Sequence, residues 1–205
     1  MKDGVRALGV AESYQGAVSL LAGAVVTPNR VVDGFAFETC SVGGLDATAA
    51  IETLSASLER EDVQYLLVSG IAPAWFNVLD LEALHEATGL PVLSVSFEES
   101  PGLEEPIREA FSGVELERRL DRYEAQPDRE PITVNGETRF VRSVGLSEPA
   151  ERVVSAFTPV GGRPEPLRVA RLAARGVEEL VFERGVDTGA GGSNIDRTHR
   201  RDGES

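Results

Sequence analysis

The order of its apolar segments is the feature that most constrains what this chain can fold into. Three β-rich runs come first, at residues 5–13, 16–27 and 30–42, and the turn-like segments SYQG and TPNR join them. Two short, continuous apolar runs follow at 63–70 and 91–97, with a helical pattern between them. Successive strands joined by short turns predict an antiparallel meander, whereas continuous apolar strands separated by helices predict parallel pairing.

Helical patterns and one hairpin complete the predicted elements. Asp46 is placed to cap the helix that follows the meander, and Gly89 is placed to end a helix that begins near residue 76. Asn135-Gly136, between two alternating runs, predicts a type I′ hairpin. Further helices are expected at 104–113, 114–125, 147–157 and 164–176.

Together these elements predict an α/β protein with a mixed sheet, three antiparallel strands and then two parallel strands, flanked by helices. We expect a single domain at 1–184 and, because residues 185–205 lack apolar periodicity, a disordered tail. Open sheets of this kind bind ligands at the carboxyl ends of their strands. A site is therefore expected near residues 10–14, 43–48 and 69–77.

The charged residues are unusual in kind as well as in number. Asp and Glu total 34 against 20 Lys and Arg, the net charge is -14, and Lys2 is the only lysine. An acid-rich, lysine-poor chain is what we expect of a halophilic protein, because high ionic strength screens the repulsion between carboxylates. Salt also weakens binding that depends on phosphate neutralisation, so nucleic-acid binding here would use geometry, stacking or metal ions.

Cysteine content and hydropathy indicate the cytoplasm. The single cysteine, Cys40, cannot form an intramolecular disulfide, and the first ten residues lack the apolar region of a secretory signal. The longest apolar stretch, at 16–26, is too short to cross a bilayer, so no membrane partner is expected.

Three segments together resemble a known family. They are VGGLDAT (42–48), SGIAPAWFNVLDLEALHEATGLPVLSV (69–95) and GRPEPLRVARLAARG (162–176). Over most of residues 5–178 the sequence resembles an archaeal family of uncharacterised proteins, domain of unknown function family ninety-nine, which is itself similar to endonuclease V. The resemblance implies a ribonuclease H-like fold.

The resemblance also implies a nuclease site in which three carboxylates hold Mg²⁺ against a scissile phosphate. The matching positions are Glu12, Asp46 and Ser69; Glu12 is one methylene longer than the implied aspartate, and Ser69 carries no charge. Phe97 stands where endonuclease V carries a lysine. The catalytic site is therefore expected to be degenerate, unless another acid such as Asp80 or Glu38 completes it.

Simpler structural roles compete with these assignments. Glu12 could be a solvated strand-end acid, and Asp46 could serve only as an N-cap. Trp75 and Phe76 lie in a loop at the ligand edge, where aromatic rings stack on unpaired bases or close the core. Opposite orientations of the two neighbours would bury one ring and leave the other available.

The last helix carries the basic stripe of the sequence. Arg168, Arg171 and Arg175 share one helical face. The stripe either contacts phosphate or pairs with Glu165, Glu178 and Glu179, and pairing is the favoured interpretation. A structural alternative for Arg168 is an ion pair with a buried acid such as Asp46 or Asp80.

Three functions remain open at this point. The favoured one is an endonuclease V-related protein with a degenerate catalytic site that retains nucleic-acid binding. The second is a Mg²⁺-dependent endonuclease that hydrolyses phosphodiesters with a rebuilt site, and the third is a protein interaction module. Three clustered carboxylates at the strand ends would favour the enzyme.

Overall fold

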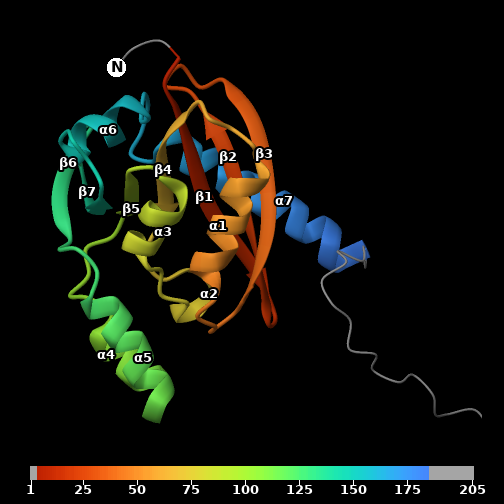
Figure 1. The fold of residues 1–205 in the computed structure, drawn as a ribbon, viewed down its shortest axis with the longest axis vertical. Coiled ribbons are helices and arrows are strands. Elements are labelled where there is room, and N and C mark those ends of the chain that lie inside the picture. The colour runs from red at the N-terminus through yellow and green to blue at the C-terminus, as the bar shows by residue number, and fades with distance from the viewer. Residues whose placement is uncertain (1–3, 185–205) are drawn as a thin grey trace, which may run out of the picture.

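Seven strands form one mixed sheet in the computed structural model, which describes residues 4–184. The sheet has the order β3-β2-β1-β4-β5-β7-β6 (Figure 1). The predicted tail at 185–205 lies outside the described residues. The strands are β1 (Arg6–Gln15), β2 (Val18–Val26), β3 (Val32–Ser41), β4 (Val63–Ser69), β5 (Val92–Ser96), β6 (Glu130–Val134) and β7 (Glu137–Val144).

The predicted strand pairing is confirmed. β1, β2 and β3 form an antiparallel meander, and β4 pairs in parallel with both β1 and β5. The predicted hairpin joins β6 to β7 through Asn135 and Gly136, whose φ angles are 53° and 80°. Because β7 pairs antiparallel with β5, this hairpin extends the same sheet beyond the five strands that were predicted.

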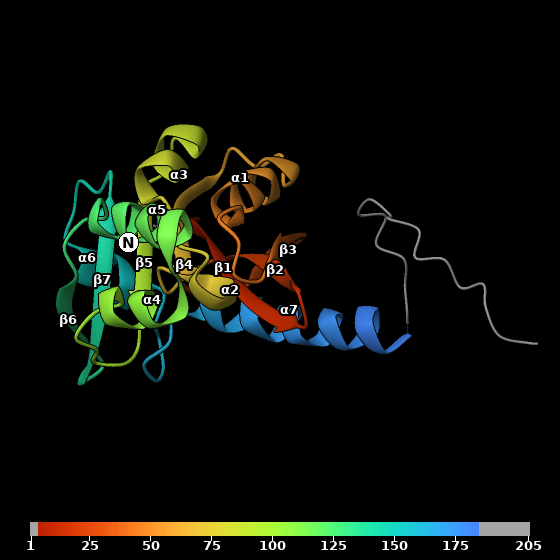
Figure 2. The ribbon, with the colours of Figure 1, turned by 90° about the horizontal axis from the view of Figure 1, so that it is seen from below.

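Helices cover both faces of the sheet. α1 (Ala47–Ser57) and α3 (Leu81–Thr88) lie on one face, and α6 (Ala150–Ala156) and α7 (Glu165–Arg184) pack on the other (Figure 2). Alternate residues of a strand point to opposite faces, so Leu8 and Val10 pack towards α1 while Ala11 packs towards α7. Within residues 4–184, no helix combines the length and apolar character that a bilayer crossing requires.

Three further helices lie beyond the carboxyl ends of β4 and β5, at the lower end of the view in Figure 1. They are α2 (Pro73–Phe76), α4 (Glu104–Ala110) and α5 (Gly113–Glu124). Their position encloses the edge of the sheet where ligands were expected.

The helix predicted to begin near residue 76 begins at Leu81 instead. The Asp80 carboxylate accepts a hydrogen bond from the Ala83 backbone N–H at 3.0 Å and caps α3, and Gly89 ends it in the left-handed conformation, as predicted. Residues 73–76 form the separate turn α2, in which Ala74 and Trp75 have left-handed backbone angles. A left-handed segment cannot continue into a right-handed helix, so the helix needs a new start at Asp80.

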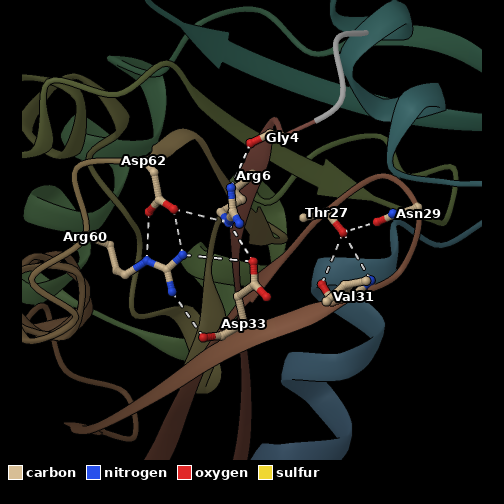
Figure 3. Close-up of polar contacts among 8 residues, drawn as sticks. All are labelled: Gly4, Arg6, Thr27, Asn29, Val31, Asp33, Arg60 and Asp62. Carbon is tan, nitrogen blue, oxygen red and sulfur yellow. Dashed lines mark hydrogen bonds and ion pairs between the residues drawn. The ribbon is translucent and has the colours of Figure 1, made fainter.

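A cluster of ion pairs fixes the opposite end of the sheet (Figure 3). Arg6 Nε lies 2.6 Å from Asp33 Oδ2 and 3.2 Å from Asp62 Oδ2. Arg60 binds the Asp62 carboxylate through two hydrogen bonds of 2.7 Å. The cluster joins the start of β1, the start of β3 and the connection from α1 to β4, so its carboxylates are occupied far from the expected site.

Candidate functional site at the carboxyl ends of the strands

Two of the predicted site residues, Glu12 and Asp46, lie close to the buried thiol of Cys40. Burial, and then the charges of Asp46 and Glu12, raise the pKa of Cys40 to about 12. Ser69 ends β4, next to β1, and lines the same small void as Glu12. The structure therefore brings Glu12 and Asp46 into one cluster and places Ser69 beside it.

The Glu12 carboxylate connects the first hairpin to α2. Its Oε2 accepts hydrogen bonds from the Ser19 hydroxyl at 2.7 Å and from the Ala74 backbone N–H at 2.8 Å. Ser19 is fully buried and Glu12 is half-buried. Glu12 is thus an anchor for the 73–76 segment rather than a solvated strand-end acid.

Asp46 stands at the N-cap position of α1, but its side chain does not cap the helix. Its carboxylate accepts from the Ser41 backbone N–H at 3.1 Å, the Ser41 hydroxyl at 2.8 Å and the Asn77 amide at 2.7 Å. Partial burial opposes ionisation, yet the hydrogen bonds from Asn77 and Ser41 prevail and lower the pKa of Asp46. The predicted N-cap role is wrong because Asp46 turns towards the end of β3.

Asn77 performs the capping that was expected of Asp46. Its Oδ1 accepts a hydrogen bond from the Ala47 backbone N–H at 3.0 Å, and its Nδ2 also donates to the Ser41 carbonyl at 2.9 Å. Asn77 is fully buried. A side chain that follows α2 therefore satisfies both the first turn of α1 and the end of β3.

Protein donors already engage most of the acceptor positions of the Glu12 and Asp46 carboxylates. Both oxygens of Asp46 and Oε2 of Glu12 already accept hydrogen bonds from protein donors, which a metal ion would have to displace. The acids considered as replacements are used elsewhere, since Asp80 caps α3 and Glu38 accepts from the Thr39 backbone N–H at 2.8 Å. Among the described residues, no group of three His, Cys, Asp or Glu side chains could hold a metal.

The α2 segment holds Trp75 at the surface in a strained backbone. Ala74, Trp75 and Phe76 have consecutive positive φ angles of 49°, 55° and 61°, a conformation that costs a non-glycine residue about 1–3 kcal/mol. Trp75 is 50% exposed, whereas Phe76 is half-buried and packs against the buried cluster that includes Ile107 and Tyr123. The structure thus places one ring of the pair at the surface and the other against the core, as the alternation of neighbours suggested.

The loop that carries Trp75 packs closely on the loop before α1. The Gly43 N–H donates to the Ala74 carbonyl at 2.7 Å, and a Cβ on Gly43 would lie 2.8 Å from Trp75 Cε3. From α5, Arg119 binds the Gly43 carbonyl and Arg122 binds the Leu45 carbonyl at 3.0 Å. The sequence patterns did not single out these two arginines, because nothing local indicates that α5 packs against residues 43–45.

The basic stripe on α7 lies apart from this cluster. Arg168 pairs with Glu165 at 2.6 Å and is exposed, so the alternative of an ion pair with Asp46 or Asp80 is wrong. The reason is helical spacing, since Glu165 lies one turn before Arg168 on the same helix. Arg171 is exposed on the following turn.

Ser69 and Phe97 both line a cavity of about 400 Å³ between the ends of β4 and β5 and the helices beyond them. The Arg163 guanidinium lies 3.8 Å from the centroid of the Phe97 ring. At the position where the resemblance implies a lysine, this chain thus has an aromatic ring with an arginine stacked on it.

The position of Cys40 predicts a thiol that reacts slowly with alkylating reagents. Since its pKa rises from an ordinary 9.0 to about 12, the reactive thiolate at pH 8 should be about a thousandfold rarer in the folded protein than in the unfolded chain. Alkylation by iodoacetamide at pH 8, followed by mass spectrometry with and without urea, measures the ratio. Equal rates in both states would contradict the placement of Cys40 between Glu12 and Asp46.

The same shift has a consequence for stability at high pH. The unfolded thiol ionises first as the pH rises above about 9, while the folded thiol stays neutral. The contribution of Cys40 to the free energy of unfolding is therefore complete below pH 9 and is lost as the pH approaches 12.

Comparison with solved structures defines the class of protein. A protein of unknown function from Archaeoglobus fulgidus matches with a TM-score of 0.74 at 26% identity, covering 84% of this chain and 98% of that one. Endonuclease V from Bacillus subtilis matches with a TM-score of 0.56 at 13% identity, covering 88% and 82%. Endonuclease V from Ciona intestinalis, in complex with a 24mer DNA containing an inosine followed by a ribo-adenosine, matches with a TM-score of 0.54 at 14% identity. This match covers 86% of this chain and 87% of that one. The fold is the ribonuclease H-like fold of endonuclease V.

Sequence comparison identifies the family. A UPF0215 protein from Pyrobaculum calidifontis is 34% identical over 182 residues, covering 86% of this chain and 99% of its own length. A UPF0215 protein from Methanopyrus kandleri is 35% identical over 185 residues, covering 86% and 93%. Residues 3–178 match the family described as Endonuclease dU, and the chain belongs to that family. The predicted relationship to an archaeal, endonuclease V-like family is thereby confirmed.

Proposed function

We propose that this protein binds nucleic acid through the nuclease-like edge of its sheet and has lost metal-dependent strand cleavage. The observation that carries the proposal is the state of the three matching positions. Glu12 and Asp46 are engaged by protein donors, and the third position is the neutral Ser69. A divalent cation that activates water for phosphodiester hydrolysis needs more negative charge than this arrangement offers.

Retained binding is supported by Trp75. A tryptophan ring that is 50% exposed, on a backbone fixed at Ala74 by hydrogen bonds to Glu12 and Gly43, is a pre-organised surface for stacking on an unpaired base. Stacking does not depend on phosphate neutralisation, so it persists at the ionic strength that the acidic composition suits. The Ciona endonuclease V, which has the same fold, is bound to a 24mer DNA in its crystal structure.

The second candidate is a metal-dependent endonuclease, and the family match favours it. The family description, Endonuclease dU, names an endonuclease. In that case Glu12 and Asp46 would have to release their present partners and recruit a further ligand when DNA and Mg²⁺ bind.

The experiment separates binding from cleavage. Single- and double-stranded oligonucleotides that contain deoxyuridine or deoxyinosine, with unmodified controls, are incubated with the protein in high KCl with Mg²⁺ or Mn²⁺. Fluorescence anisotropy measures binding, and denaturing gels measure cleavage. We expect binding of single strands without cleavage.

Matched variants assign these results to residues. Trp75→Ala should weaken binding about tenfold, because stacking on an aromatic side chain is worth about 1–3 kcal/mol per base. Phe35→Ala, which removes another exposed aromatic ring near the start of β3, at the other end of that strand from Ser41, should leave binding unchanged. Cleavage that Glu12→Gln abolishes would overturn the proposal and establish the endonuclease.

A further inference from the structure

The cavity beside Ser69 is lined by arginines in a chain dominated by acids. Arg129, Arg142 and Arg163 line it, and Glu98, on the exposed rim, is the one acidic residue among the lining side chains. Three positive charges against one negative charge leave a formal excess of two positive charges, although the chain as a whole carries -14. This local reversal of sign needs a physical explanation.

None of the three guanidinium groups forms an ion pair with a carboxylate within residues 4–180, whose side chains the structure describes. Arg129 binds the Ser100 carbonyl at 3.0 Å and stacks over Phe140, and Arg142 donates to the Tyr123 hydroxyl at 2.9 Å. Arg163 Nη1 is buried without any hydrogen-bond partner in the described structure. Carbonyls, hydroxyls and rings orient these groups without an ion pair, and Glu99 offsets the charge of Arg129 only in part.

The arginines also raise each other's electrostatic cost. Partial burial, and then repulsion from Arg171 and Arg139, lower the pKa of Arg163. Partial burial and repulsion from Arg142 lower the pKa of Arg129, against the opposing effects of Tyr123 and Glu99. Partial burial of cations that form no ion pair is unfavourable, and a cluster of them persists only where something offsets the cost. A bound anion would supply that compensation.

The chemistry of the lining selects the kind of anion. Guanidinium groups present planar pairs of donors that match phosphate oxygens, and hydroxyls of Ser69, Ser96 and Ser100 line the same space. A volume of about 400 Å³ exceeds what a bare phosphate fills and falls within the range of small-ligand sites. The formal excess of two positive charges matches a phosphate monoester, which is largely a dianion above pH of about 6.

We propose that this cavity binds a phosphate monoester, carried either by a free nucleotide or by the phosphorylated end of a nucleic-acid strand. The second source rests on the proposed function, whereas the first does not. The half-buried arginines make this site less sensitive to salt than a surface basic patch, because partly buried charges are screened less than exposed ones. The site is separate from the Trp75 surface and adjoins the Glu12 cluster through Ser69.

Calorimetry on the full chain at constant, high KCl tests the site with defined probes. Thymidine 5′-monophosphate should bind, thymidine should bind at least tenfold more weakly, and inorganic phosphate should compete. Affinity for the monophosphate should rise as the pH increases from 5 to 7, because the dianion replaces the monoanion near pH of about 6. A 5′-phosphorylated oligonucleotide compared with its 5′-hydroxyl form tests the second source.

Variants link the binding to the cavity. Arg163→Gln should weaken monophosphate binding about tenfold or more, whereas Arg175→Gln, which removes an exposed arginine of α7, should not change it. Circular dichroism and urea unfolding establish that Arg163→Gln is folded, and Arg129→Lys provides a second variant that keeps the charge but removes the fork of donors.

The outcomes distinguish this site from the proposed function. Equal affinity for thymidine and its monophosphate, or an Arg163→Gln variant that binds the monophosphate normally, would overturn the cavity assignment. Single-stranded DNA that binds through Trp75 with no effect of a 5′-phosphate or of free nucleotide would leave the proposed function standing without this site. Monophosphate binding without DNA binding would support the cavity and overturn the proposed function.

Discussion

Replacement of Asn77 by leucine is expected to lower the free energy of unfolding by about 3 to 5 kcal/mol. Leucine preserves the volume of the side chain but removes the acceptor of the Ala47 N–H and the donor to the Ser41 carbonyl and Asp46. Ala47 and Asn77 are both fully buried, so water does not replace the lost partner of that N–H. A buried polar group without a partner costs about 1–3 kcal/mol, and the Ala47 N–H becomes such a group here. The hydrogen bonds to the Asp46 carboxylate and to the Ser41 carbonyl are lost as well, although the Ser41 carbonyl keeps the Gly44 N–H as a donor.

Urea unfolding monitored by circular dichroism measures the effect at a fixed KCl concentration. Asn29→Leu is the matched control, since Asn29 is exposed in the turn between β2 and β3, and its effect should stay within about 1 kcal/mol. The double variant with Asp46→Ala should be less destabilised than the sum of the two single variants, because both remove the same hydrogen bond. Additive effects of the two substitutions would contradict the coupling of Asn77 to Asp46.

Gly9→Ala is expected to cost about 3 kcal/mol, an unusually large effect for the addition of one methyl group. A Cβ on Gly9 would lie 2.3 Å from the carbonyl carbon of Pro166, at the start of α7. Backbone cannot rotate away as a flexible side chain can, so α7 would have to shift from β1 and disturb the packing of Ala11 against Ala170.

Gly176→Ala is the matched control, because it makes the same substitution in the middle of α7 with no atom within 4 Å of the new Cβ. It should stabilise the protein by up to about 1 kcal/mol through the higher helix propensity of alanine. Unfolding midpoints in urea compare the two variants directly. A Gly9→Ala variant as stable as Gly176→Ala would show that α7 does not approach β1 this closely.

The Pro-Glu-Pro segment, residues 164–166, and the residue after it have a structural role that the pattern of arginines on α7 did not predict. Pro166 lies against Gly9, and Leu167 is fully buried in the core beneath β4 and β5. Arg168 faces outward and pairs with Glu165. The part of this segment that packs is therefore its proline and leucine, while the arginine remains exposed.

The sequence by itself determined the antiparallel meander, the parallel direction of β4 and β5 and the second hairpin, but not that this hairpin joins the same sheet. Alternating and continuous apolar runs, the Asn135-Gly136 turn and the Gly89 helix end are local signals, because periodicity and backbone preference act within a few residues. The same signals predicted a ligand site near residues 10–14, 43–48 and 69–77, and the resemblance to the family pointed to Glu12, Asp46 and Ser69 within it. They could not tell where the helix after Ser69 begins, because the left-handed segment at 74–76 is held by contacts with Glu12 and Gly43 rather than by its own preferences.

Only the tertiary structure decided what the site residues contact. Asp46 meets Asn77 across 31 positions of sequence, and the result is a carboxylate held by an amide where a helix cap or a metal ligand was expected. No local sequence pattern predicts the arginine cavity. Arg129, Arg142 and Arg163 come from three separate segments, which come together only when the second hairpin pairs with β5. Side-chain partners depend on which surfaces of the folded chain pack together. Short-range periodicity predicts which face of a helix or strand is apolar, but not which other element packs against it.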